Sequence, residues 1–142
     1  MVERQFRVGT RELGRGLDAL EAELRRARVR EEAVLDLRLV AEEVLTNIAH
    51  YGHDDGGEHW VRLRLTLDAG EATLEFTDDG RPFDPLAAAP PGLADRDGER
   101  PVGGLGILLT RALVDGAGYA RRGAENVLTL TKRLPPADGD VS

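Results

Sequence analysis

The sequence predicts an α+β fold, a two-layer sandwich with helices on one face of a mixed, mostly antiparallel sheet. Two segments near the N-terminus repeat leucine, valine and alanine at helical spacing. Two further regions each contain alternating segments joined by a short turn, which is typical of a β-hairpin. No repeat or linker divides the 142 residues, so we expect one domain over residues 1–134 and a flexible tail over residues 135–142.

The N-terminal part of the chain is expected to form one strand and two helices. Apolar residues alternate over residues 2–8, which predicts an edge strand. Thr10 is the expected N-cap of a first helix, which Gly14 and Gly16 weaken locally. The apolar stripe of this helix is Leu13, Leu17, Leu20 and Leu24. A second helix is expected from about Glu31 to His50, where the turn-forming sequence GHDDGG follows.

The middle of the chain contains the most regular pattern, a hairpin with strands over residues 60–68 and 72–78. The regular pattern then stops, because the segment from Arg81 to Gly104 inclusive contains five prolines and four glycines. Loops of this length inside a compact domain are usually functional, so we expect a lid over about residues 85–103.

The C-terminal part is expected to return to regular structure. Leucines at helical spacing predict a helix over residues 105–115, with Ala112 on its buried side and Gly116 and Gly118 at its end. A second hairpin is expected from Tyr119 to Leu134.

Composition excludes several classes of function. The net charge of −7 argues against a broad nucleic-acid-binding surface. The absence of cysteine removes disulfides, thiolate metal sites and cysteine nucleophiles. No apolar run is long enough to span a membrane, and the expected localisation is cytoplasmic.

Asp78 is the first candidate site residue, because it ends a strand on the side that should be core. Alternation places Ala72, Leu74 and Phe76 on one face, and Asp78 continues that face. The sequence Asp-Asp-Gly is strong turn chemistry, so a strand-terminal turn is one interpretation. The other is that the carboxylate accepts a hydrogen bond from the amino group of adenine, while Gly80 lets the backbone approach the base.

Glu43 and Asn47 form the second candidate, one turn apart on the second helix. The same spacing also fits a polar pair on a helix surface. The functional interpretation is a metal site, because an amide oxygen is a hard ligand suited to Mg²⁺, which keeps most of its shell for water and phosphates. A glutamate one turn earlier can accept a hydroxyl proton.

The sequence GGLGI at residues 103–107 is the third candidate, at the start of the expected last helix. Glycines before a helix allow backbone amides to approach phosphate oxygens, although a flexible loop end has the same composition. Neither a P-loop nor a dinucleotide-binding fingerprint is present.

Taken in order, these motifs resemble the GHKL (Bergerat-fold) ATP-binding superfamily. EEVLTNIAHYG is similar to its N-box, DDGRPFD to its first glycine box and PVGGLGI to its second, and the resemblance covers Phe6 to Leu134. The short form and the D-x-G-x-x-F-D pattern are similar to the bacterial anti-sigma-factor serine kinases. Those proteins bind a sigma factor and phosphorylate an antagonist protein on serine or threonine.

The resemblance implies roles for residues of the first two motifs. Asn47 would coordinate Mg²⁺ at the phosphates of ATP, and Glu43 would be the catalytic carboxylate. Asp78 would contact the adenine amino group, with Gly80 beside the base.

The second glycine box would supply the phosphate contacts. Gly104 and Gly106 would bind the phosphates through backbone amides. Arg100 is a candidate contact to the γ-phosphate, because a guanidinium suits a transferred phosphate. A solvated loop charge is an equal alternative for Arg100.

The function that follows is an ATP- and Mg²⁺-dependent serine/threonine kinase acting on an anti-sigma-factor antagonist, with a sigma factor as second partner. The alternative is a non-catalytic ATP-binding regulatory module. Pro82 favours the alternative, because it replaces the second glycine of the first glycine box and has no N–H. The resemblance is compatible with a homodimer, for which the sequence shows no patch.

Overall fold

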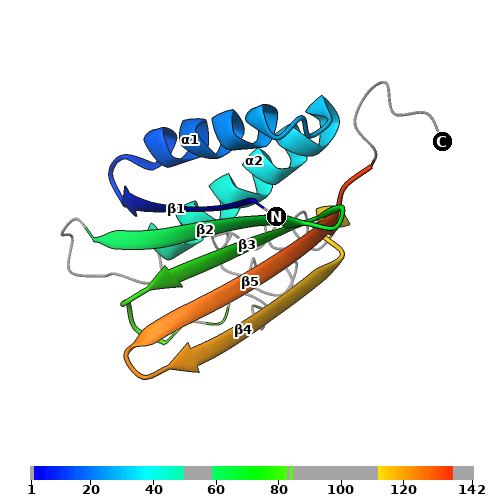
Figure 1. Cartoon of the computed structure of the whole chain (residues 1–142). Coiled ribbons are helices and arrows are strands. Elements are labelled where there is room, and N and C mark those ends of the chain that lie inside the picture. The colour runs from blue at the N-terminus through cyan, green and yellow to red at the C-terminus, as the bar shows by residue number, and fades with distance from the viewer. Residues whose placement is uncertain (1, 50–58, 83, 85–111, 136–142) are drawn as a thin grey trace, which may run out of the picture.

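Two helices lie across one face of a five-stranded sheet (Figure 1). The structure is a computed structural model, and it describes residues 2–49, 59–82, 84 and 112–135. Its elements are β1 (Val2–Gly9), α1 (Leu13–Arg26), α2 (Glu31–Asn47), β2 (Trp60–Asp68), β3 (Glu71–Asp78), β4 (Gly116–Arg122) and β5 (Glu125–Arg133). The predicted α+β two-layer architecture is therefore confirmed.

The strand order is β1-β2-β3-β5-β4, and β1 is an edge strand as predicted. All four described strand pairs are antiparallel, so the expectation of a mixed sheet is wrong for this part of the chain. Ala69 and Gly70 both have positive φ, 53° and 77°, which is the geometry of a two-residue hairpin turn between β2 and β3. The C-terminal hairpin joins the sheet through β5, which pairs with β3.

The core lies between the helices and the sheet face that they cover. Its largest fully buried side chains are Phe76, Leu20, Leu24, Leu37, Leu45, Leu63, Leu65, Leu74, Leu130, Val34, Val40 and Val44. Gly16 lets α1 approach β1 closely, because a Cβ at this position would lie 2.4 Å from Cγ2 of Val8. The glycine that weakens the helix locally therefore has a packing role.

Thr10 does not cap α1, contrary to the sequence prediction. The residue before the helix is Glu12, and no side chain caps the helix. Thr10 instead donates its backbone N–H to the His59 carbonyl over 2.9 Å, and its Oγ1 accepts the His59 N–H over 3.1 Å. Its polar groups therefore join the end of β1 to the start of β2.

Gly116 and Gly118 do not end a helix; they belong to β4. Gly116 pairs with Thr131, and a Cβ on the glycine would lie 2.5 Å from the threonine Oγ1. The glycine is therefore needed for close strand packing. Ala112 is exposed, not buried as expected.

Several predicted elements lie outside the described residues. These are the lid over residues 85–103, most of the helix over residues 105–115 and most of the C-terminal tail. The second helix ends at Asn47, and Ile48 and Ala49 form a π-helical turn. In the described part of the chain, no helix is long and apolar enough to cross a membrane.

Candidate functional site

The described candidate residues gather at one end of the sheet. Figure 1 shows the C-terminal end of α2 at the end of the sheet where β3 finishes and β2 begins. Asn47 is the last residue of α2, and Asp78 is the last residue of β3. Both are buried polar residues in an otherwise apolar layer.

Asp78 lies on the helix-covered face of β3, as its alternation with Phe76 predicts. Its Oδ1 accepts the backbone N–H of Gly80 over 2.9 Å, which forms an Asx-turn at the strand end. Oδ1 also accepts the Nδ2 amide of Asn126 over 3.1 Å. Both bonds use one oxygen, so within the described residues Oδ2 keeps its capacity as an acceptor.

Asn126 holds this strand end in place from β5, where it pairs directly with Asp78. Besides binding Asp78, its Nδ2 donates to the Arg81 carbonyl over 2.8 Å. Its Oδ1 accepts the Tyr119 hydroxyl over 2.5 Å. Arg121 adds a further contact, from Nη1 to the Gly80 carbonyl over 2.7 Å. The turn at residues 78–81 is thus fixed by side chains of β4 and β5.

Sequence reasoning missed Asn126, although a signal was present. Along β5, Leu128 and Leu130 share a face, and Asn126 continues it by the same alternation that singled out Asp78. Two polar residues that interrupt apolar faces at strand ends are candidates for one buried network.

Asn47 differs from Asp78 in having no hydrogen-bond partner for its side chain in the described part of the chain. It is 3% exposed, and neither Oδ1 nor Nδ2 has a hydrogen-bond partner among the residues that the structure describes. An unsatisfied buried amide is costly, about 1–3 kcal/mol, and such groups are rare in native proteins. The orphaned amide is therefore an observation that fits a ligand.

Glu43 lies one turn before Asn47 and is half-buried. In the described structure its carboxylate takes part in no hydrogen bond or ion pair. A carboxylate and an unpartnered amide thus project from the same side of α2 near its C-terminal end.

The structure describes only some of the remaining predicted site residues. Gly80 is described and buried, with its carbonyl and N–H both bonded as above. Pro82 is described and exposed. Arg100, Gly104 and Gly106 lie outside the described residues, so their predicted roles stay predictions.

The described residues include no group of three or more His, Cys, Asp or Glu side chains that could hold a metal ion. They do fit a cation that needs few protein ligands. Mg²⁺ binds proteins through one or two oxygen ligands and takes the rest from water and phosphates. The unpartnered Oδ1 of Asn47 is an oxygen of that kind.

The fold and this strand-end site define an α+β domain of the kinase-type ATPase class. Residues 9–132 match the family described as the histidine kinase-like ATPase domain, and the chain belongs to this family. Family membership implies that the chain binds ATP.

One curated relative is similar to most of the chain. The serine/threonine-protein kinase BtrW of Bordetella bronchiseptica is 34% identical over 100 residues, which is 70% of this chain and 70% of that protein.

Solved structures share the fold, among them the following two. The RsbU and RsbW domains of Rv1364c from Mycobacterium tuberculosis match with a TM-score of 0.67 and 14% identity, covering 94% of this chain and 32% of that chain. The histidine kinase domain of the blue-light-activated histidine kinase EL346 from Erythrobacter litoralis matches with a TM-score of 0.54 and 22% identity. That match covers 88% of this chain and 60% of that one.

Proposed function

We propose that this chain binds ATP with Mg²⁺ and is a serine/threonine protein kinase that phosphorylates an anti-sigma-factor antagonist. The observation that carries the proposal is the pair of buried polar residues at one end of the sheet. Asp78 has one oxygen held by the protein and one available, and Asn47 has an amide with no described partner.

Asp78 would read the base. Its free Oδ2 can accept a hydrogen bond from the amino group of adenine, while guanine offers a carbonyl acceptor at the same position. Facing a carbonyl, the carboxylate would be left unpaired at a cost of about 1–3 kcal/mol, so this residue favours ATP over GTP. Gly80 has no side chain, which allows the base to approach the backbone.

Asn47 would hold the metal through its Oδ1. Bound Mg²⁺ supplies neutralisation of the phosphate charge, which is a main requirement of phosphoryl transfer. We assign the other phosphate contacts to Gly104 and Gly106 through backbone amides and to Arg100 through its guanidinium. These three residues are assigned from sequence alone.

Glu43 would act on the attacking hydroxyl of the protein substrate. Its carboxylate lies one turn from Asn47, and no described residue engages it. It can orient the hydroxyl and accept its proton as the oxygen attacks. The lid over residues 85–103 would exclude water, which competes as an acceptor.

The substrate class rests on similarity. The relative BtrW is named a serine/threonine-protein kinase, and the fold of an RsbW domain matches most of this chain. We therefore infer an antagonist protein as the phosphate acceptor and a sigma factor as a second partner, in the cytoplasm. The proposal is compatible with a monomer or a homodimer.

A second candidate function is an ATP-binding regulatory module without turnover. Pro82 motivates it, because a proline in the first glycine box removes an N–H and fixes φ close to −65°. This module would bind ATP through Asp78 and Asn47 and act by contact with its partner.

Calorimetric titration tests the binding step. The chain should bind Mg-ATP, bind Mg-GTP at least about ten-fold more weakly, and lose the preference in Asp78→Asn. Equal affinity for the two nucleotides would remove the role assigned to Asp78.

Phosphoryl transfer separates the two candidates. With γ-labelled ATP and the cognate antagonist protein, the kinase should label the antagonist, and Glu43→Gln should abolish labelling while ATP binding is kept. Glu42→Gln is the matched control, because Glu42 is the exposed neighbour of Glu43. ATP binding without labelling would favour the regulatory module.

A further inference from the structure

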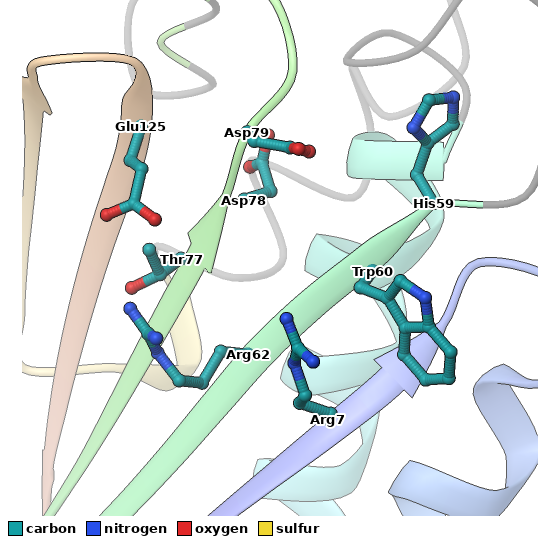
Figure 2. A pocket seen from close by; sticks show the side chains of 8 residues that line it. All are labelled: Arg7, His59, Trp60, Arg62, Thr77, Asp78, Asp79 and Glu125. Atoms are coloured by element: carbon teal, nitrogen blue, oxygen red, sulfur yellow. The ribbon is translucent and has the colours of Figure 1, made fainter.

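A cavity lies on the face of the sheet that is turned away from the helices (Figure 2). It has a volume of about 190 Å³ and is lined by Arg7, His59, Trp60, Arg62, Thr77, Asp78, Asp79 and Glu125. Figure 2 shows Arg7 and Arg62 side by side on β1 and β2, with Trp60 beyond Arg7 and Thr77 beyond Arg62. Nothing in the proposed nucleotide site uses these four side chains.

Two arginines face each other across the strand pair. Arg7 and Arg62 are direct partners in the β1–β2 register, so their side chains leave the sheet on the same face. Like charges directly opposite each other are destabilising. Neither guanidinium forms an ion pair with a described carboxylate, whereas Arg64 on the same face lies 3.9 Å from Glu3 and 3.8 Å from Glu75.

Thr77 contributes an unpartnered polar group. It is 6% exposed, lines the cavity and forms no side-chain hydrogen bond within the described structure. Its hydroxyl is not one of the fully buried side-chain atoms that lack a partner, so it is accessible from the cavity and can donate its O–H to an acceptor there.

Trp60 supplies an apolar surface beside the cations. It is 49% exposed, although large apolar side chains are mostly covered elsewhere in the described structure. The Arg7 guanidinium carbon lies 5.8 Å from the centre of its ring, within the range of a cation–π contact. This contact holds the guanidinium at the mouth of the cavity without neutralising it.

The cavity also contains carboxylates, and their position limits what can bind. Asp79 and Glu125 come from the β3 and β5 side, whereas Arg7 and Trp60 come from the β1 and β2 side (Figure 2). Asp78 also borders the cavity, but its Oδ1 is bonded to Gly80 and Asn126. The site is therefore cationic at one end and acidic at the other, which disfavours a simple polyanion.

The size of the cavity also limits which kind of ligand can bind. Pockets for small molecules usually measure about 300–1,000 Å³, so this one is small for a free metabolite. It suits one side chain of a peptide, with backbone N–H groups of the same peptide able to donate to the acidic end.

We propose that this cavity docks an acidic segment of a partner protein, with a Glu or Asp carboxylate bound by Arg7, Arg62 and the Thr77 hydroxyl and a neighbouring apolar side chain on Trp60. Charge complementarity supports an acidic partner, because the guanidiniums of Arg7 and Arg62 and the hydroxyl of Thr77 have no acceptor among the residues that the structure describes. The proposal does not depend on nucleotide binding or turnover.

The test uses the only tryptophan of the chain as a reporter. In a ¹⁵N-labelled sample of the full chain, the Trp60 indole N–H gives one signal, which is followed by NMR during titration with two peptides. The probe is acetyl-Leu-Glu-Glu-Leu-amide, and the control is acetyl-Leu-Gln-Gln-Leu-amide. The glutamate peptide should shift the signal saturably, and the glutamine peptide should not.

Variants localise the binding. Arg62→Gln should weaken the glutamate peptide about ten-fold, because one charge-assisted contact is lost. Thr77→Val keeps the shape of the side chain and should weaken it about five-fold through loss of the hydroxyl. Arg64→Gln is the matched control on the same face and should change affinity by no more than about two-fold, since its charge is already paired.

Three outcomes would overturn the proposal. Equal weakening by Arg62→Gln and Arg64→Gln would mean unspecific attraction to the sheet face. An equal response to both peptides would remove the role of the carboxylate. An indole shift that follows protein concentration without peptide, with dimers in sedimentation equilibrium, would make this face an interface between two copies.

Discussion

Asp78 and Asn47 are both buried polar residues at one end of the sheet, yet their hydrogen bonding differs. Asp78 is held by two donors, the backbone N–H of Gly80 and the side-chain amide of Asn126. Asn47 has no partner among the described residues for either atom of its amide. Asp78 belongs to a hydrogen-bond network within the protein, whereas the side chain of Asn47 has no hydrogen bond to the described residues.

This difference in hydrogen bonding indicates different roles: the bonds of Asp78 position its side chain, whereas the free amide of Asn47 is suited to binding a ligand. A satisfied buried carboxylate contributes to stability and fixes the direction of its free oxygen. An unsatisfied amide costs stability and is retained only where another role compensates. We therefore expect mutations at Asp78 to lower both folding stability and ATP affinity. Mutations at Asn47 should lower ATP affinity without lowering folding stability.

Asp78→Ala should have the largest combined effect. It leaves the Gly80 N–H without its partner and removes one acceptor of Asn126, so the free energy of unfolding should fall by about 2 kcal/mol. ATP affinity should fall at least about thirty-fold, because the carboxylate also contacts the base. Urea denaturation and calorimetric titration measure the two effects. A loss of affinity with unchanged stability would mean that the network contributes nothing to folding.

Asn47→Leu should lower ATP affinity about thirty-fold or more while leaving stability unchanged or higher. The leucine removes the metal ligand, and it also removes a buried amide that costs about 1–3 kcal/mol when unpaired. The same two measurements apply, with Mg²⁺ present and absent. The contrast with Asp78 fails if Asn47→Leu destabilises the fold as strongly as Asp78→Ala.

Tyr119→Phe tests whether Asn126 must be anchored to position Asp78. The variant removes only the hydroxyl that donates to Asn126 Oδ1, so the free energy of unfolding should fall by about 1 kcal/mol. ATP affinity should fall only about three-fold, because Asn126 keeps its bonds to Asp78 and the Arg81 carbonyl. A loss of ATP affinity as large as that in Asp78→Ala would indicate that Tyr119 contacts the nucleotide directly.

The smallest effect is expected at an exposed pair that joins α1 to α2, far from the buried network. Arg25 Nη2 lies 2.5 Å from Glu31 Oε1, and this hydrogen bond holds the pKa of Glu31 below its ordinary value of 4.5. Because the pKa is lower in the folded state, the contribution to stability is present above that value and is lost as pH falls through the folded pKa.

Glu31→Gln should therefore lower stability slightly at about pH 7 and have a smaller effect at about pH 3, where the carboxylate becomes protonated. Urea denaturation of the wild-type protein and the variant at both pH values measures this. Glu32→Gln is the control, because no described residue pairs with Glu32. An equal effect of Glu31→Gln at both pH values would contradict the assignment.

Local patterns alone determined most of the described fold. Alternation with period two predicted β1, β2, β3 and β5, since one face of each strand is buried. The same alternation predicted that Asp78 faces the core, and helical spacing placed Glu43 and Asn47 on one side of α2. These conclusions need only neighbours along the chain, so the sequence suffices for them.

The tertiary structure decided which distant residues meet. Strand pairing placed Asn126 beside Asp78 and Arg62 beside Arg7, and neither pairing is encoded in the local period of its own strand. Tertiary structure also explains why Thr10 does not cap α1 as its position suggests. Its hydroxyl instead accepts a hydrogen bond from the residue that precedes β2. Periodicity determines which face a side chain occupies, whereas its partners depend on contacts between segments far apart in the chain.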